Sequence, residues 1–403
     1  MMKRKLGIVC ILLLLLFGCS KDIKNMNSNN QFEVDIIEEK SSQADFEKET
    51  AQNMQQDQEA TRDKFSEKTG EKFYYNTLSD DLKNVYAELY NAVTTFEKDK
   101  LVSTLLSEDV DFVFRCVMND SPELFYVSGY TCTKHMVGKE LKSLTINTKY
   151  TMEQEEIVVY QDKIDVYAKK CFARMNEELT DYEKIQYIYN YVIKNTEYDM
   201  EAENNQNICS VFVSNKSVCQ GYAKATQYLL SRLGFEVTVV SGIVNEETPH
   251  VWNLIKLEDQ YYYMDPTWGD ADYQFVAKEE KVSAIVMPIN YDFFLITTRE
   301  LEKTHQINSL VKLPECNAVK ANYYRKTGTY FTKLNKTQLQ FVFERAYRNK
   351  TDSVTIKCES RSVYERMQEF LIKEQNVFRY IKCKDSIAYV DNDRMYTLCF
   401  WIY

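Results

Sequence analysis

The chain is poor in the residues that mark irregular or repetitive architectures. Its 403 residues include only 10 glycines and 5 prolines, which excludes collagen-like, glycine-rich and proline-rich proteins. Histidine is scarcer still, at three residues, so any chemistry that needs an imidazole has three candidates. Basic residues are outnumbered, with 50 Lys and Arg against 60 Asp and Glu. We therefore expect no nucleic-acid partner, because nucleic-acid-binding proteins present a basic surface to the phosphates.

Apolar residues are abundant enough to form packed cores. They make up 44% of the chain, and aromatic residues make up 13%, which excludes wholesale disorder. A chain of this length is expected to contain two or three domains once targeting and linker segments are set aside. Only one segment, at the N-terminus, is apolar enough to engage a bilayer.

The first twenty residues have the pattern of a bacterial export signal. Lys3, Arg4 and Lys5 precede the apolar run Leu6 to Phe17, which is too short to span a bilayer. The sequence Leu16-Phe17-Gly18-Cys19 resembles a lipobox, which implies cleavage before Cys19 and lipidation of its thiol. A plain signal peptide or an uncleaved anchor are the alternatives. We expect a protein held by lipid on the extracytoplasmic face of the cell membrane.

The composition along the chain suggests five segments. Residues 21–72 are polar, and we interpret them as a flexible tether, with a helix packed on the body as the alternative. Capping signals at Ser79 and at Thr180-Asp181-Tyr182-Glu183 predict two helices in the folded part. The expected segments are 1–18 signal peptide, 19–72 lipidated cysteine and tether, 73–178 mostly helical region, 179–313 core domain and 314–403 small α+β C-terminal domain.

The stretch from Ser210 to Asp270 carries the candidate chemistry. Cys219 is placed at a predicted helix N-terminus, where unpaired N–H groups favour a thiolate. His250 lies on a predicted strand and could serve as its base, and Asp265 on the next strand could orient the imidazole. If Glu258-Asp259 forms a two-residue turn, His250 and Asp265 are diagonal neighbours on one face. A turn one residue longer would place them on opposite faces.

Three blocks around these residues resemble the signatures of the transglutaminase-like superfamily. They are Ser217-Val218-Cys219-Gln220-Gly221-Tyr222-Ala223, His250-Val251-Trp252-Asn253 and Tyr263-Met264-Asp265-Pro266-Thr267-Trp268. The resemblance implies a papain-like α+β fold, with a helix bearing Cys219 packed on an antiparallel sheet bearing His250 and Asp265. It implies Cys219 as nucleophile, His250 as general base and acid, and Asp265 as orienting residue. The wider chain resembles surface lipoproteins of Gram-positive bacteria.

The expected function is cysteine-dependent acyl transfer without a metal or cofactor. We expect hydrolysis of peptide or amide bonds through an acyl-thioester on Cys219, with a peptide or protein substrate such as cell-wall peptide. Transamidation is the second choice, because nothing in the sequence shows an amine site or excludes water. A non-catalytic binding or scaffold lipoprotein that kept the fold is the other alternative.

The other residues that could take part in the chemistry are weaker candidates. We expect His135 at the surface and His305 at a helix end, and Trp252 and Trp268 as core residues or walls of the cleft. The backbone N–H of Cys219 is one candidate oxyanion donor. Gln206 and Asn207 precede the cysteine helix and have suitable side chains for a second donor, but neither is assigned.

Overall fold

The structure, a computed structural model, describes residues 7–10, 32–41, 72–270, 288–382 and 386–402. The described chain mixes helices with parallel and antiparallel strands, which confirms the α+β class. It divides into two units that are described separately. Unit 1 holds the described residues of Met1–Ser20, Gln260–His305 and Glu315–Tyr403, and unit 2 holds those of Lys21–Asp259 and Gln306–Pro314. Among the described residues, no helix is both long and apolar enough to cross a bilayer.

The first part of unit 2, expected to be mostly helical, also contains a hairpin of two long strands. Its helices are α3 (Phe73–Thr77), α4 (Asp80–Thr95), α5 (Ser107–Asp120) and α6 (Gln154–Phe172). Its strands are β3 (Lys100–Val102), β4 (Val127–Val137) and β5 (Glu140–Tyr150), with β4 and β5 antiparallel. Ser79 caps α4 as predicted, because its side chain accepts from the Leu82 N–H.

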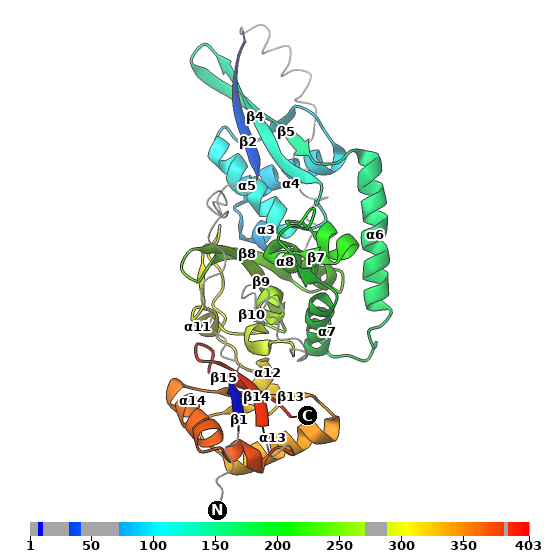
Figure 1. Ribbon diagram of the computed structural model, residues 1–403. Coiled ribbons are helices and arrows are strands. Elements are labelled where there is room, and N and C mark those ends of the chain that lie inside the picture. The colour runs from blue at the N-terminus through cyan, green and yellow to red at the C-terminus, as the bar shows by residue number, and fades with distance from the viewer. Residues whose placement is uncertain (1–6, 11–31, 42–71, 271–287, 383–385, 403) are drawn as a thin grey trace, which may run out of the picture. The chain divides into compact units, whose positions relative to one another are not determined.

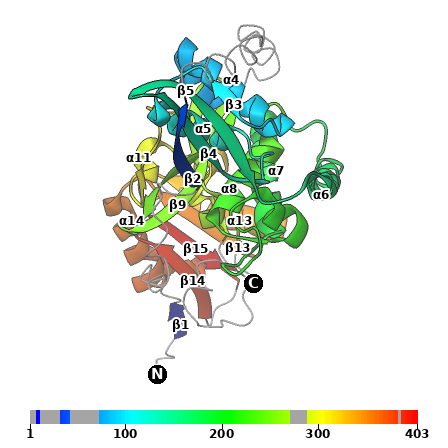
Figure 2. The same cartoon turned by 90° about the horizontal axis from the view of Figure 1, so that it is seen from above.

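A strand lies inside the segment that we expected to be a tether. Strand β2 (Glu33–Ser41) pairs in parallel with β4 along its whole length, and Figures 1 and 2 both show the two strands side by side. The expectation of a free tether is therefore wrong for these nine residues. Backbone hydrogen bonds hold a strand without many apolar side chains, so composition missed it. Lys149 adds an ion pair, with its Nζ 2.7 Å from Asp35 Oδ2.

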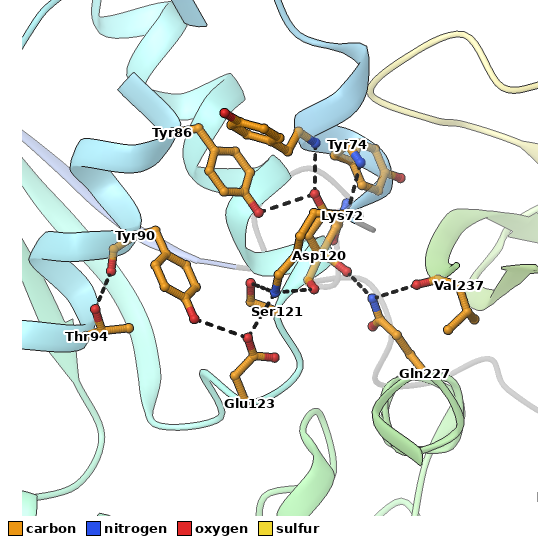
Figure 3. Close-up of polar contacts among 12 residues, drawn as sticks. Lys72, Tyr74, Tyr86, Tyr90, Thr94, Asp120, Ser121, Glu123, Gln227 and Val237 are labelled. Atoms are coloured by element: carbon orange, nitrogen blue, oxygen red, sulfur yellow. Dashed lines mark hydrogen bonds and ion pairs between the residues drawn. The ribbon is translucent and has the colours of Figure 1, made fainter. Parts of the chain in front are cut away.

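The buried carboxylate of Asp120 holds the first helix of this region in place. Asp120 accepts hydrogen bonds from the backbone N–H groups of Tyr74 (3.0 Å) and Tyr75 (2.9 Å), so it caps helix α3 from a distant part of the chain. The Lys72 ammonium donates to the Asp120 carbonyl at 2.9 Å (Figure 3). Burial raises the pKa of Asp120 to about 6. Figure 3 also shows Gln227, whose amide donates to the neighbouring Asn119 carbonyl at 2.8 Å.

The second part of unit 2 packs a helix against two antiparallel strands. Its elements are α7 (Asp181–Lys194), β6 (Glu197–Tyr198), η2 (Ser210–Ser214), β7 (Lys216–Ser217), α8 (Cys219–Ser231), β8 (Val237–Val244) and β9 (Thr248–Leu257). Thr180 and Glu183 form the predicted capping box at the start of α7. Strands β8 and β9 pair from Val237 opposite Ile255 to Val244 opposite Thr248.

Unit 1 begins with short elements. They are β10 (Gln260–Met264), α9 (Pro266–Gly269), η3 (Tyr291–Phe293) and α11 (Thr298–Leu301), followed by His305, where β11 (His305–Ile307) starts. The chain returns to this unit at Glu315, one residue after the start expected for the C-terminal domain.

The rest of unit 1 is the expected small α+β arrangement. Its elements are α12 (Tyr323–Lys326), β12 (Tyr330–Phe331), α13 (Lys336–Asn349), β13 (Ser353–Cys358), α14 (Arg361–Gln368), η4 (Glu369–Lys373), η5 (Asn376–Arg379), β14 (Ser386–Asn392) and β15 (Thr397–Trp401). The sheet has the order β1-β14-β15-β13-β12, where β1 (Gly7–Cys10) lies inside the expected signal peptide. Apolar side chains from α13, α14 and the strands form its core.

A buried ion pair connects the two parts of unit 1. Lys357 on β13 and Asp292 in η3 are 1% and 3% exposed at their side chains, with Nζ and Oδ1 3.4 Å apart. The Thr397 hydroxyl donates to Asp292 Oδ2 at 2.7 Å, and Glu300 Oε1 lies 3.5 Å from the same ammonium. Burial alone would lower the pKa of Lys357, but Asp292 and Glu300 raise it above its ordinary value.

Candidate active site

Cys219 is the first residue of helix α8, as predicted, and its side chain is partly exposed. Gly221, two residues later, lets the preceding loop pack closely on this helix start. A Cβ atom at Gly221 would come 1.9 Å from Ser217 Oγ and 2.9 Å from Ser210 Oγ. Those two hydroxyls share a 2.6 Å hydrogen bond, so the loop is closed against the first turn of α8. Close packing of the residues before and after Cys219 therefore fixes its position.

Cys219 differs from every other cysteine whose side chain the structure describes. The other seven thiols are buried, whereas Cys219 is partly exposed, and none of the eight is in a disulfide. Burial raises the pKa of all seven, for example to about 12 for Cys209 and Cys316. A buried neutral thiol is a poor nucleophile. Among the described cysteines, Cys219 alone combines access with a helix N-terminus.

The helix of Cys219 packs on the strand of His250, which sequence alone could not show. The Asn253 amide on β9 donates to the Ala223 carbonyl on α8 at 2.9 Å. The Gln227 amide on α8 donates to the Val237 carbonyl at the start of β8, at 3.4 Å. His250 is 5% exposed, and its ring stacks on Trp252 with centroids 6.1 Å apart. Nucleophile and base candidates thus belong to packed elements of unit 2.

Asp265 follows the predicted two-residue turn but does not lie in a strand. Strand β9 ends at Leu257 and β10 begins at Gln260, so the turn is Glu258–Asp259, as predicted. Strand β10 ends at Met264, so the prediction that Asp265 lies on this strand is wrong, because Pro266 starts helix α9. Asp265 is the N-cap of that helix. Its Oδ1 accepts from the N–H groups of Thr267 (2.9 Å) and Trp268 (3.1 Å).

His305 has a role that the sequence did not predict. We expected it at a helix end, but its Nε2 lies 3.1 Å from Asp265 Oδ2, and both side chains are 0% exposed. Its Nδ1 lies 2.7 Å from the Thr304 hydroxyl, and its ring packs against Trp268 at 4.9 Å between centroids. Forty positions separate His305 from Asp265 along the chain, and no local pattern marks the pair. The structure therefore places a buried histidine directly beside the candidate carboxylate.

His135 is buried, contrary to the expectation of a surface residue. It is 8% exposed, its Nε2 is 2.9 Å from the Thr145 hydroxyl, and its Nδ1 is 3.7 Å from Glu39 Oε2. Glu39 belongs to β2, the strand that the sequence did not reveal, so the same omission explains both errors. These contacts are structural ones within the β2-β4-β5-β3 sheet.

The two side chains considered as oxyanion donors, those of Gln206 and Asn207, donate hydrogen bonds to other groups. The Asn207 amide donates to the Phe125 carbonyl at 3.2 Å, and its carbonyl oxygen accepts from the Cys209 N–H at 2.9 Å. The Gln206 amide donates to Asn205 Oδ1 at 3.1 Å. The helix-start N–H of Cys219 remains the donor candidate that the fold itself provides.

Helix α8 also carries a buried lysine. Lys224 is 7% exposed, and burial lowers its pKa to about 8, while the charge of Glu123 acts in the opposite direction. In the described part of the chain it has no ion-pair partner within 4 Å. Within either unit taken alone, the described residues bring together no trio of His, Cys, Asp or Glu side chains able to hold a metal ion.

The sequence of residues 169–266 matches the transglutaminase-like superfamily. The matched segment contains Cys219 and His250 and ends directly after Asp265. The chain carries a transglutaminase-like domain. This domain includes α7, α8, β8 and β9, the elements that position the candidate thiol and imidazole. Members of this superfamily include cysteine-dependent enzymes, and the domain accounts for the α+β core of unit 2.

Curated relatives match only part of the chain. Kyphoscoliosis peptidase from Homo sapiens is 24% identical over 134 residues, which is 27% of this chain and 20% of that protein. The protein of the same name from Mus musculus is 24% identical over 111 residues, covering 24% and 17%. The chain thus spans about a fifth of the length of these relatives.

Two solved structures align with part of the chain. A structure described as a TGase has a TM-score of 0.25 at 17% identity, covering 35% of this chain and 44% of that one. An arylamine N-acetyltransferase from Bacillus cereus has a TM-score of 0.19 at 17% identity, covering 30% and 51%. Both scores are below 0.5, so the assignment of the domain rests on the sequence match.

Proposed function

We propose that the protein is a cysteine-dependent acyl-transfer enzyme that hydrolyses peptide or amide bonds, with Cys219, His250 and Asp265 as its catalytic triad. The observation that carries the proposal is the setting of Cys219. It is the one described thiol that is not buried, and it begins a helix that packs on the strand of His250. The match to a superfamily with this chemistry supports the same assignment.

In the proposed reaction His250 takes the proton of the Cys219 thiol, and the thiolate attacks the carbonyl carbon of the substrate amide. His250 then returns the proton to the leaving amine nitrogen, the C–N bond breaks, and an acyl-thioester remains on Cys219. Water attacks the thioester with His250 again accepting a proton. The C–S bond breaks, the carboxyl product leaves, and Cys219 and His250 are restored with one proton between them. Asp265 orients the imidazole and stabilises its charged form.

We further propose that Cys19 is lipidated and that the enzyme acts outside the cytoplasm at the cell membrane. The lipobox-like sequence Leu16-Phe17-Gly18-Cys19 supports this location, and peptides of the cell wall are the substrates it would meet. Cleavage before Cys19 would also remove strand β1 and leave β14 at the edge of its sheet. Mass spectrometry of the mature N-terminus tests the proposal. A lipid-modified Cys19 is expected, and an unmodified residue at that position would refute the anchor.

Selective alkylation tests the proposed nucleophile. At pH 6.5, iodoacetamide is expected to modify Cys219 far faster than Cys209, which is buried in the same unit and serves as internal reference. His250→Ala should slow Cys219 modification on the order of 100-fold, because an ordinary thiol of pKa about 8.5 is roughly 1% thiolate at that pH. Equal slow modification of both cysteines, unchanged by His250→Ala, would favour the non-catalytic scaffold.

Product analysis separates hydrolysis from transamidation. The wild type and Cys219→Ser are incubated with glutamine-containing peptides in the presence and absence of a primary amine. Carboxylate products that depend on Cys219 are expected. Amine adducts formed in preference to carboxylates would contradict hydrolysis while leaving the nucleophile assignment intact.

A further inference from the structure

We infer that His305 is a positioning residue that holds the carboxylate of Asp265 for its role in the triad. This inference rests on the proposed function, because it assigns His305 a part in the reactivity of Cys219. The two residues belong to the same unit, and their contact is direct.

The carboxylate of Asp265 has a separate partner on each oxygen. Oδ1 accepts from the N–H groups of Thr267 and Trp268, which are fixed by the first turn of α9. Oδ2 faces His305 Nε2 at 3.1 Å. Without His305 the backbone would still cap Oδ1, whereas Oδ2 would lose this contact. His305 therefore contributes to holding the carboxylate in its orientation.

The chemistry of the carboxylate and of Thr304 selects one tautomer of His305. An ionised carboxylate only accepts hydrogen bonds, so Nε2 must carry the proton that points to Asp265. In the neutral ring, Nδ1 is then an acceptor. The Thr304 hydroxyl can donate to Nδ1 at 2.7 Å or to the Leu301 carbonyl at 3.3 Å, and the shorter contact satisfies the ring. Thr304 therefore orients His305, and His305 orients Asp265.

Aromatic side chains pack against the imidazole of His305. Its ring packs against the aromatic rings of Trp268, at 4.9 Å, and Phe293, at 5.5 Å between centroids, and those two rings also pack on each other. These rings exclude water and hold the imidazole plane. A hydrogen bond to an ionised group in such a dry setting is stronger than one in solvent. The loss of a hydrogen bond to a charged group typically changes an equilibrium constant by about tenfold or more.

Variants of His305 and Thr304 test this role through the rate of Cys219 alkylation in the full-length chain, measured from pH 5 to 8. His305→Phe keeps an aromatic ring but removes the donor, so it should lower the rate at pH 6.5 at least about tenfold. It should also move the acidic limb of the profile to higher pH, because a carboxylate without its donor is protonated more easily. His305→Gln places an amide N–H near the same point and should stay within about threefold of the wild type.

Thr304→Val is the matched control for tautomer selection. It removes only the hydroxyl, and its effect should lie between those of His305→Gln and His305→Phe. Because the chain has three histidines, ¹⁵N-histidine spectra can be assigned by single substitutions. The spectrum of the wild type should show His305 as the Nε2–H tautomer even if His305→Phe does not fold.

The possible failures are distinguishable. If wild-type Cys219 reacts no faster than the buried thiols, the proposed function fails, and the role of His305 fails with it. If wild-type Cys219 reacts fast and His305→Phe matches it, only the positioning role is overturned. An Nδ1–H tautomer for His305, or equal losses in His305→Phe and His305→Gln, would also overturn it.

Discussion

Two buried lysines, one in each unit, have opposite electrostatic settings. Lys357 in unit 1 is surrounded by Asp292 and Glu300, and its pKa is raised despite burial. Lys224 in unit 2, on the helix of Cys219, has no ion pair in the described chain, and burial lowers its pKa to about 8. The charge of Lys357 is compensated by carboxylates within 4 Å, whereas that of Lys224 has only the more distant charge of Glu123. Uncompensated polar groups are expected where a protein gives up stability for function.

The largest effect is expected from Lys357→Met. Removing the ammonium leaves the buried Asp292 and the half-buried Glu300 without their cation, and breaking such a buried pair typically costs about 3–5 kcal/mol. Hydrogen exchange of the β13 and β15 amides measures this loss in unit 1 without relying on a single unfolding transition. Thr397→Val, which removes only the hydroxyl donor to Asp292, is the milder control, at about 1 kcal/mol. Unchanged exchange in Lys357→Met would show that the ion pair contributes nothing.

Lys224→Met should have the opposite effect on stability and stabilise the folded state. Because the folded state holds this lysine with a pKa of about 8, below the unfolded value of about 10.4, the folded state binds its proton more weakly. The resulting cost is fully present below pH 8 and disappears as the pH rises towards 10.4. Methionine should therefore stabilise unit 2 by about 1–3 kcal/mol at pH 7, with little gain near pH 10.5. Thermal unfolding at both pH values checks the sign, and a loss of stability at pH 7 would contradict it.

Two buried aspartates in unit 1 test which charges stabilise the fold and which support the reactivity of Cys219. Asp292→Asn weakens the pair with Lys357 and should destabilise unit 1 without altering the pH profile of Cys219 alkylation. Asp265→Asn keeps an N-cap side chain, since asparagine caps as well as aspartate, so the start of α9 should be retained. It should nevertheless reduce Cys219 reactivity. Reduced Cys219 reactivity in Asp292→Asn together with unchanged reactivity in Asp265→Asn would refute the distinction.

The parts of the fold that depend on local chemistry could be predicted from the sequence. Caps at Ser79 and Thr180 and the turn at Glu258–Asp259 act within a few residues, and the structure confirms them. Cys219 at the start of α8 follows from the same kind of signal.

Features that depend on distant partners could not be predicted. Strand β2 is held through its backbone by β4, which lies almost a hundred residues later, so its polar composition gave no sign of pairing. His305 reaches Asp265 across 40 positions, and Lys357 reaches Asp292 across 65. In each case the partner is chosen by tertiary packing, which no spacing rule in the sequence reports.

The central claim is that Cys219 and His250 form a thiolate–imidazolium pair. Titration of ¹⁵N-labelled His250, in the wild type and in Cys219→Ser, measures that pair directly. We predict that His250 in the wild type stays charged at pH 7 and loses its proton at distinctly lower pH once the thiolate is removed. Identical titration of His250 in both proteins would contradict the account.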